Sequence, residues 1–186
     1  MLIRPATIDD IPALAELAAL TFPLATPSHT TPESIQTFID QVLSPSMFEA
    51  YLSDQRIDLI VAEDDDALVG YVMLKGGEPY DPDVAKAVTI RPTVELSKCY
   101  VHPDAHGSGL AQQLVIASLE AAEARGGAVL WLGVNQENDR AQRFYDKAGF
   151  ERVGEKRFQV GDGLEHDYVY QRRLRLRVRK PGRGER

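Results

Sequence analysis

The stretch Asp104–Leu114, with the sequence DAHGSGLAQQL, places Gly107, Ser108 and Gly109 directly before a helical pattern. Glycine near a helix start is costly unless the chain needs backbone that is free of side chains there. A helix N-terminus offers unpaired N–H groups and the positive end of the helix dipole, so an anion can bind where side chains are absent. The pattern therefore indicates a phosphate or pyrophosphate site, with a plain tight turn between strand and helix as the alternative.

Two common nucleotide motifs do not fit this stretch. The dinucleotide fingerprint G-x-G-x-x-G/A is met by Gly107 and Gly109, but its third position is Gln112. A P-loop requires Gly-Lys-Ser/Thr, and no such triplet follows. The anion site is therefore expected to be of another kind.

A metal site is disfavoured in the same region. His102 and His106 lie four residues apart with Asp104 between them, but Pro103 prevents a regular helix there. No further cluster of ligand residues is visible in the sequence. We expect no bound metal.

Hydrophobic periodicity predicts one α/β domain over residues 1–174. Strands 93–101 and 128–134 are joined through a helix, so we expect them to be parallel neighbours in a mixed sheet of about seven strands, with helices on its faces. Residues 76–92 are expected to form a long loop. Helices are predicted over 9–22, 31–43, 44–54, 108–125 and 138–149, and strands over 2–6, 56–63, 67–75, 93–101, 128–134, 150–160 and 164–174, the last two as a hairpin around the sequence GDG at 161–163.

Charge is unevenly distributed along the chain. Of the 21 basic and 28 acidic residues, residues 172–186 hold eight basic and one acidic, which leaves 13 basic and 27 acidic residues ahead of them. An acidic body argues against a nucleic-acid partner. The basic segment 175–186 is expected to be a disordered, solvated tail, with contact to an acidic partner surface as the alternative.

Other features indicate a soluble cytoplasmic protein. No apolar run reaches the length of a membrane span, and the N-terminus MLIRPATIDD lacks the apolar core of a secretory signal. The single cysteine, Cys99, excludes an intrachain disulfide and is expected to be a buried thiol.

The second half of the chain carries a further pattern, LWLGVNQENDRAQRFYDKAGF, with Asn138, Tyr145 and a terminal AGF. Together with YVHPDAHGSGLAQQL it closely resembles the GNAT family of N-acetyltransferases, whose signature is Arg/Gln-x-x-Gly-x-Gly/Ala on the loop that enters a helix. The resemblance covers about residues 2–174 and is strong over 94–150. It implies a GNAT fold whose central parallel strands splay apart to admit acetyl-CoA.

The resemblance also implies which residues bind that co-substrate. Backbone N–H groups of the glycine loop would hold the pyrophosphate, main-chain groups near Cys99 would pair with the pantetheine arm, and Asn138 would contact the arm. His106 stands where Arg or Gln is usual, so it donates to phosphate less strongly unless it is protonated. The implied binding residues are Cys99, Tyr100, Val101, His106, Gly107, Ser108, Gly109, Leu110, Ala111 and Asn138.

Acetyl transfer to an amine needs a base for the amine proton and an acid for the leaving thiolate. Tyr145 is the expected acid, with core packing as the alternative. Some family members that modify protein N-termini have a Glu where this chain has Gly133. Glu95 is therefore the expected base, with an exposed strand-end carboxylate as the alternative. Regular alternation would place Glu95 on one face with Ser97, Cys99 and Val101.

The acceptor is expected to be a small amine. The segments VELSKCYV, LWLGVNQEN and FQVGDGLEHDYVYQRRL look similar to a bacterial subgroup that includes polyamine acetyltransferases. Glu78, Asp81 and Asp83 would attract a polyamine if their loop folded over the acceptor cleft, with a solvated loop as the alternative. A peptide or protein amine, an antibiotic or amino-acid amine, and a low-turnover acyl-CoA sensor remain open. Many relatives are dimers, so the resemblance also allows a homodimer.

Overall fold

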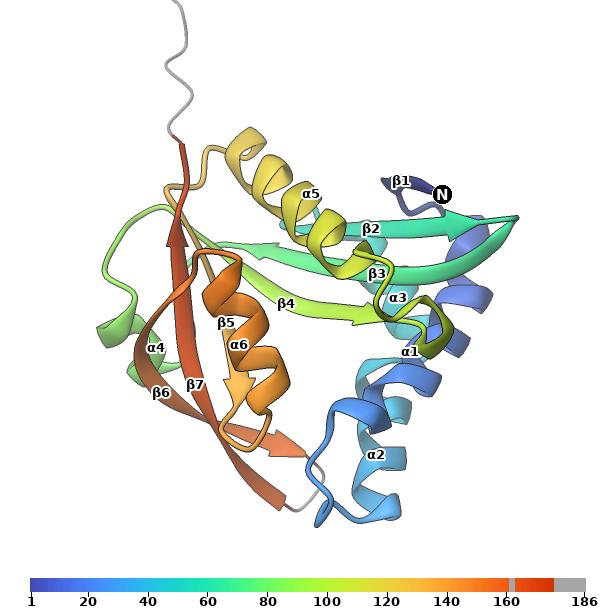
Figure 1. Ribbon diagram of the computed structural model, residues 1–186, viewed down its shortest axis with the longest axis horizontal. Helices are drawn as coiled ribbons and strands as arrows, with labels where there is room; N and C mark the ends of the chain where they lie inside the picture. The colour runs from blue at the N-terminus through green and yellow to red at the C-terminus, as the bar shows by residue number, and fades with distance from the viewer. Residues whose placement is uncertain (161–162, 176–186) are drawn as a thin grey trace, which may run out of the picture.

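A seven-stranded mixed sheet forms the centre of the molecule in the computed structural model, which describes residues 1–160 and 163–175. The strand order is β1-β2-β3-β4-β5-β7-β6, and every neighbouring pair except β4 and β5 is antiparallel (Figure 1). The predicted single α/β domain is thereby confirmed. The strands are β1 (Leu2–Pro5), β2 (Ile57–Asp64), β3 (Ala67–Gly76), β4 (Thr93–Val101), β5 (Val129–Asn135), β6 (Glu151–Val160) and β7 (Gly163–Arg173).

The helices begin at the caps that the sequence carries. In α2, Thr31 Oγ1 accepts a hydrogen bond of 3.2 Å from Ser34 N, and Pro32 occupies the first turn. Among the described residues, no helix is long and apolar enough to cross a bilayer. The helices are α1 (Ile11–Ala25), α2 (Pro32–Val42), α3 (Pro45–Ser53), α4 (Pro82–Ala87), α5 (Leu110–Ala124) and α6 (Asp139–Lys147), with 3-10 turns η1 (Ile8–Asp10) and η2 (Pro103–Ala105).

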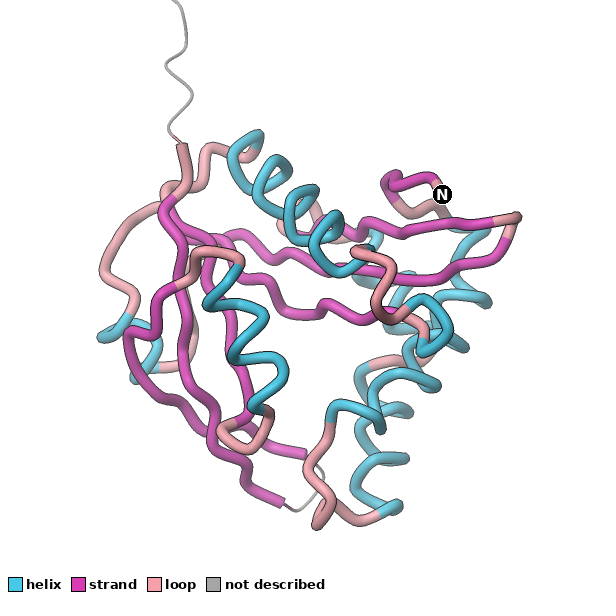
Figure 2. The backbone as a smooth tube through the Cα atoms, viewed as in Figure 1, coloured by secondary structure: helices cyan, strands magenta, loops and turns pink. Residues whose placement is uncertain are grey.

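Helices cover both faces of the sheet (Figure 2). Helices α1 and α3 pack on one face of β2 and β3, and α2 packs against α1, in a core that contains Phe48 and Tyr71. Helices α5 and α6 pack on the opposite face, in a core that contains Leu114 and Tyr145. The short α4 contributes Val84 to a third cluster against β5 and β7.

The central parallel strands separate after a short contact. Pairing between β4 and β5 covers only Thr93–Glu95 and Val129–Trp131. Beyond this point β4 continues alongside β3 and β5 alongside β7, so the sheet divides into two halves that diverge (Figure 1). The expected splaying of the central strands is confirmed, and it places an opening at the carboxyl ends of both strands.

The segment 76–92 differs from the expected loop because it contains helix α4. Asp81 caps this helix, since its Oδ1 accepts hydrogen bonds of 2.8 Å from Asp83 N and 3.3 Å from Val84 N, and Pro82 follows in the first turn. An Asp-Pro start followed by an apolar residue is a helix signal, but six residues are too few to give a clear period.

Two expectations concern residues outside the described part of the chain. The hairpin turn at 161–163 includes residues 161–162, and the basic tail lies almost wholly within 176–186, so both fall outside the described residues. The chain before the tail is ordered by packing, since Leu174 is buried and its N–H donates to Ala128 O at 3.0 Å.

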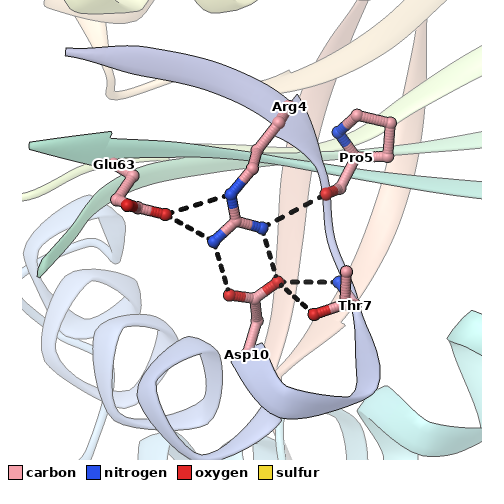
Figure 3. A network of polar contacts seen from close by, with 5 residues as sticks. All are labelled: Arg4, Pro5, Thr7, Asp10 and Glu63. Atoms are coloured by element: carbon pink, nitrogen blue, oxygen red, sulfur yellow. Dashed lines mark hydrogen bonds and ion pairs between the residues drawn. The ribbon is translucent and has the colours of Figure 1, made fainter. Parts of the chain in front are cut away.

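A charged cluster joins the first strand to the first helix (Figure 3). Arg4 on β1 donates to both carboxylate oxygens of Asp10, at 2.7 and 2.8 Å, and also to Glu63 Oε2 on β2. Asp10 Oδ2 also accepts from Thr7 N and Thr7 Oγ1, at 2.7 and 3.0 Å. The guanidinium lowers the pKa of the Asp10 carboxyl to about 2. This cluster fixes the edge strand β1 to the start of α1.

Candidate active site

Two adjoining cavities lie at the opening between β4 and β5. The glycine-loop cavity, of about 490 Å³, is lined by the N-terminal end of α5, the end of β4 and α6. The acidic cavity, of about 400 Å³, is lined by β4, β5, β7 and the end of α1. The residues that line both cavities are Ala25, Cys99, Tyr100, Asn138, Ala141 and Tyr145.

The backbone conformation of the loop requires glycine at two positions. Gly107 and Gly109 have φ values of 80° and 84°, in the left-handed region that favours glycine. A Cβ built on either glycine would meet no atom within 4 Å, whereas a Cβ on Gly127 would lie 2.8 Å from Val94 Cγ2. The two loop glycines therefore turn the chain and leave open space above the helix N-terminus.

That space faces unpaired backbone donors. In the described part of the chain, the N–H groups of Gly109, Ala111 and Gln112 have no protein acceptor. Leu110 N donates to Ser108 Oγ at 3.3 Å. Ser108 Oγ donates to Ala105 O at 2.7 Å, and Ser108 is the one residue of the predicted loop 106–111 that does not line the glycine-loop cavity. The donors and the positive helix end fit a phosphate group.

His106 lines the same cavity from the end of η2. Its Nε2 lies 3.1 Å from the carbonyl oxygen of Val101 at the end of β4. Because a carbonyl oxygen only accepts, Nε2 carries the hydrogen in this arrangement. His106 therefore connects the glycine loop to the strand expected to bind the pantetheine arm.

Asn138 has a structural role in addition to its place between the cavities. It is the N-cap of α6, and its Oδ1 accepts a hydrogen bond of 3.0 Å from Ala141 N. The carbonyl end of its side chain is thus occupied by the helix. Only the amide end remains to contact a ligand.

Tyr145 lies at the junction of the two cavities and also packs in the core. The residue is 9 % exposed, and its ring makes edge contacts with Phe144 and Phe150, at centroid distances of 5.1 and 5.5 Å. Its hydroxyl lies near enough to the Cys99 thiol for each group to affect the pKa of the other. Burial holds the pKa of Tyr145 well above its usual value and raises the pKa of Cys99 to about 11. Both groups are therefore protonated at neutral pH.

Glu95 lines the acidic cavity, on the opposite face of β4 from Cys99. Two successive residues of β3 pair with Lys98 and Leu96, so Ser97 is an extra residue that forms a β-bulge. Beyond the bulge Cys99 packs in the same core as Leu96. Glu95 therefore shares its face with Lys98. The expectation that regular alternation groups Glu95 with Ser97, Cys99 and Val101 is wrong because of this bulge.

The surroundings of this face of β4 shift the pKa values of Glu95 and Lys98. Burial raises the pKa of Glu95, although the charges of Lys156, Lys75 and Lys98 partly oppose the shift. Burial lowers the pKa of Lys98 to about 8. A carboxylate with a raised pKa in a cavity is a candidate for proton transfer.

The C-terminal hairpin contributes charged residues that the sequence analysis missed. Glu165 and Asp167 on β7 are 7 % and 6 % exposed, and both line the acidic cavity. Lys156 on β6 pairs with Asp167, with Nζ 3.2 Å from Oδ2. Glu165 and Asp167 are two residues apart on β7, so both carboxylates lie on the same face of the strand. This spacing could have indicated them from the sequence.

Gly133 provides the room for this ion pair. A Cβ on Gly133 would lie 2.5 Å from Lys156 Cε and 2.9 Å from Asp167 Oδ2. The space beside position 133 is therefore filled by the carboxylate of Asp167 from β7, the neighbouring strand, and by the ammonium group of Lys156 from β6, the strand beyond it.

The connection between α1 and α2 closes one side of the acidic cavity. His29 Nε2 lies 2.9 Å from Glu165 Oε1, and Asn135 Nδ2 donates to the other Glu165 oxygen at 3.3 Å. Thr26 and Pro27 of the same connection line the cavity. The cavity is thus bounded by both halves of the divided sheet.

The three carboxylates of the segment 78–83 do not line this cavity. Glu78 pairs with Arg91 at 2.5 Å, Asp81 caps α4, and Asp83 lies 3.6 Å from Lys86. Tyr80 alone of residues 78–83 lines the cavity. The condition under which these three carboxylates would attract a polyamine, a loop folded over the acceptor cleft, is not met, because each carboxylate is engaged locally.

Comparison with known proteins identifies the family. Residues 13–150 match the acetyltransferase (GNAT) family. This chain belongs to the GNAT family. An N-acetyltransferase of Mycobacterium tuberculosis, described as uncharacterized, is 44 % identical over 165 residues, which are 89 % of this chain and 98 % of that protein. The GNAT chain is accordingly an acetyl-CoA-dependent N-acetyltransferase.

Two further relatives extend the comparison. A ribosomal protein bS18-alanine N-acetyltransferase of Haemophilus ducreyi is 35 % identical over 85 residues, 45 % of this chain and 58 % of that protein. The PaiA N-acetyltransferase of Thermoplasma acidophilum, solved in complex with coenzyme A, has the same fold. Its TM-score is 0.72 at 20 % identity, covering 93 % of this chain and 98 % of that one. In the described residues, no group of three or more His, Cys, Asp or Glu side chains is arranged to hold a metal ion.

Proposed function

We propose that this GNAT enzyme transfers the acetyl group of acetyl-CoA to a primary amine of a small molecule bound in the acidic cavity, with a polyamine as the favoured acceptor. The observation that carries the proposal is the composition of that cavity. It is lined by three carboxylates, Glu95, Glu165 and Asp167, against two lysines, Lys98 and Lys156. Such a cavity favours an acceptor that arrives as a cation.

The glycine-loop cavity is the proposed site of the co-substrate. Backbone N–H groups from Gly107 to Ala111 would hold the pyrophosphate, and main-chain groups of Cys99, Tyr100 and Val101 would pair with the pantetheine arm. The open space above Gly107 and Gly109 and the unpaired donors behind it support this assignment. The amide end of Asn138 is the proposed contact of the arm.

Tyr145 is the proposed acid. The amine nitrogen attacks the thioester carbonyl, a C–N bond forms, the C–S bond breaks, and the departing thiolate takes the Tyr145 hydroxyl proton. Its protonated state and its position at the junction of the two cavities support this role. A carboxylate of the acidic cavity receives the amine proton, and Glu95 is the candidate that the sequence indicates.

A peptide N-terminus is the second candidate acceptor. The partial match to a ribosomal protein bS18-alanine N-acetyltransferase favours it. The contact between His29 and Glu165 disfavours it, because this contact closes one side of the cavity that a peptide would enter.

Matched amine acceptors distinguish the two candidates. We expect kcat/KM for spermidine to exceed that for propylamine by about tenfold or more, since a second ammonium group gains a charge-assisted hydrogen bond. Glu165→Gln should reduce that ratio. An alanine-initiated peptide that reacts faster than both amines would move the assignment to peptide N-termini.

A further inference from the structure

Asp167 is a buried carboxylate that no structural role in the fold fully explains. It lies on β7, opposite Asn135 on β5 and Lys156 on β6. Its Oδ2 pairs with Lys156 Nζ at 3.2 Å. Its Oδ1 is buried and has no hydrogen-bond partner in the described part of the chain. A buried carboxylate with only one oxygen satisfied is costly in its charged form, which favours proton uptake.

This carboxylate lies where the sheet opens. Its side chain packs against Gly133, two residues beyond the last β5 residue that pairs with β4. It lines the same cavity as Tyr145. Burial is the main cause of the raised pKa of Tyr100, a residue that lines both cavities, and the charge of Asp167 adds to it. Asp167 is therefore near the junction at which an acceptor amine meets the acetyl group.

We propose that Asp167 is the general base that takes the proton from the acceptor ammonium, with Lys156 as the residue that positions its carboxylate. This inference rests on the proposed function and names the proton acceptor of the same site. The ammonium passes one proton to the Asp167 carboxylate, directly or through a water molecule, and becomes a neutral amine. That amine then attacks the thioester, the C–N bond forms, the C–S bond breaks, and Tyr145 supplies the proton that the thiolate takes up. The second proton of the attacking nitrogen leaves as the amide forms and returns to the Tyr145 oxygen through solvent, so the ammonium releases one net proton, which Asp167 holds.

The comparison with Glu95 favours Asp167. Burial raises the pKa of Glu95, but the charges of three lysines, Lys156, Lys75 and Lys98, partly oppose that shift. Asp167 has one ammonium partner and one unsatisfied oxygen. Glu95 is accordingly assigned to binding the acceptor cation.

The charges around Asp167 set its titration. Burial raises its pKa most strongly, Lys156 lowers it, Glu165 raises it and His166 lowers it. Tyr100 faces it from β4 and is neutral at ordinary pH. The net pKa is raised, so the base loses its proton, and kcat/KM rises, at a higher pH than for an ordinary aspartate.

The test compares two isosteric variants with the wild type by thiol release from acetyl-CoA on one amine. We expect Asp167→Asn to lower kcat about 100-fold or more, the usual contribution of a general base. Its affinity for acetyl-CoA, measured by calorimetry, should be unchanged. Its remaining rate should rise with pH up to the pKa of the amine, because only the neutral fraction then reacts. Glu95→Gln should raise the KM of the amine and keep most of kcat.

Controls separate the failure of the inference from the failure of the proposed function. Glu155→Gln, an exposed carboxylate on β6, should behave as the wild type. A loss of kcat in Glu95→Gln combined with wild-type kcat in Asp167→Asn would overturn the assignment and leave the proposed function intact. A wild-type enzyme that releases no thiol with any amine would overturn the proposed function and the inference with it.

A second variant covers the case in which Asp167→Asn does not fold. Lys156→Gln removes the ammonium that lowers the pKa of Asp167. The acidic limb of kcat/KM should then move to higher pH by about one unit. An unmoved limb in an active Lys156→Gln enzyme would contradict the role of Asp167.

Discussion

A few single residues decide the chemistry, and Tyr145 is the one whose structural and proposed chemical roles overlap most. Its ring packs between Phe144 and Phe150, whereas its hydroxyl lies near the Cys99 thiol and takes no part in the ring contacts. The ring therefore packs in the core, whereas the hydroxyl is the part of the side chain proposed to act at the junction of the cavities. A substitution that removes the hydroxyl alone separates the two roles.

Tyr145→Phe should lower kcat about 100-fold, because the departing thiolate loses its proton donor. The melting temperature and the Kd for acetyl-CoA should change little, since phenylalanine keeps the ring contacts. Steady-state thiol release and calorimetry on the same preparation measure these quantities. Wild-type kcat in the variant would assign Tyr145 to packing alone.

Residues of the candidate site could be predicted where one short stretch of sequence carries the complete motif. The glycine loop and Tyr145 follow from local sequence, and the structure brings them to one cavity. Asp167 and Lys156 were not predicted as site residues, because they pair with each other across two strands and fill the space beside Gly133 on a third strand. The spacing of Glu165 and Asp167 predicts a shared strand face, but the local sequence does not show that this face lines a cavity.

Among the elements, helix α5 offers an internal comparison. Gly109 at its start and Gly126 after its end have φ values of 84° and 81°, and a Cβ on either would meet no atom within 4 Å. Both positions therefore require the same left-handed backbone conformation. Gly109 lines the glycine-loop cavity, whereas Gly126 lines neither of the two cavities described above.

Gly109→Ala and Gly126→Ala should each lower the free energy of unfolding by about 1 kcal/mol, the cost of a left-handed alanine. Only Gly109→Ala should weaken acetyl-CoA binding, by about tenfold. Urea denaturation and calorimetry measure the two effects. Equal losses of affinity in both variants would show that helix stability, and not the anion site, controls binding.

Strand β4 marks the limit of pattern-based prediction at the element scale. Its bounds and its parallel partner were predicted correctly. The bulge at Ser97 was not, because alternation assumes that every residue pairs. One extra residue moved Cys99 to the face opposite Glu95. The short α4 was missed for a related reason, since six residues carry little periodicity.

At the scale of the whole molecule, the fold depends on joining elements that are distant in sequence. Arg4 links β1, β2 and the start of α1 through Asp10 and Glu63 (Figure 3). The sequence predicted the elements but not this cluster, which depends on tertiary placement. The cluster lies away from both cavities, so it offers a test of stability that is separate from activity.

Asp10→Asn should lower the free energy of unfolding at pH 7 by about 2 kcal/mol. The folded pKa of Asp10 is about 2, below the usual aspartate value of 3.8, so its contribution is complete above pH 3.8 and is lost as the pH falls toward 2. The difference between variant and wild type should therefore shrink over that interval. Asp9→Asn, at the exposed neighbouring position, is the control, and an equal loss there would contradict the role of the cluster.

The measurement that tests the central claim most directly is the initial rate of CoA thiol release from acetyl-CoA with a panel of amines. The panel comprises spermidine, spermine, propylamine, lysine and an alanine-initiated peptide, and acetyl-CoA binding is measured in parallel. The account predicts steady release that is fastest with the polyamines. Bound acetyl-CoA with no release on any amine would contradict it and would indicate an acyl-CoA sensor.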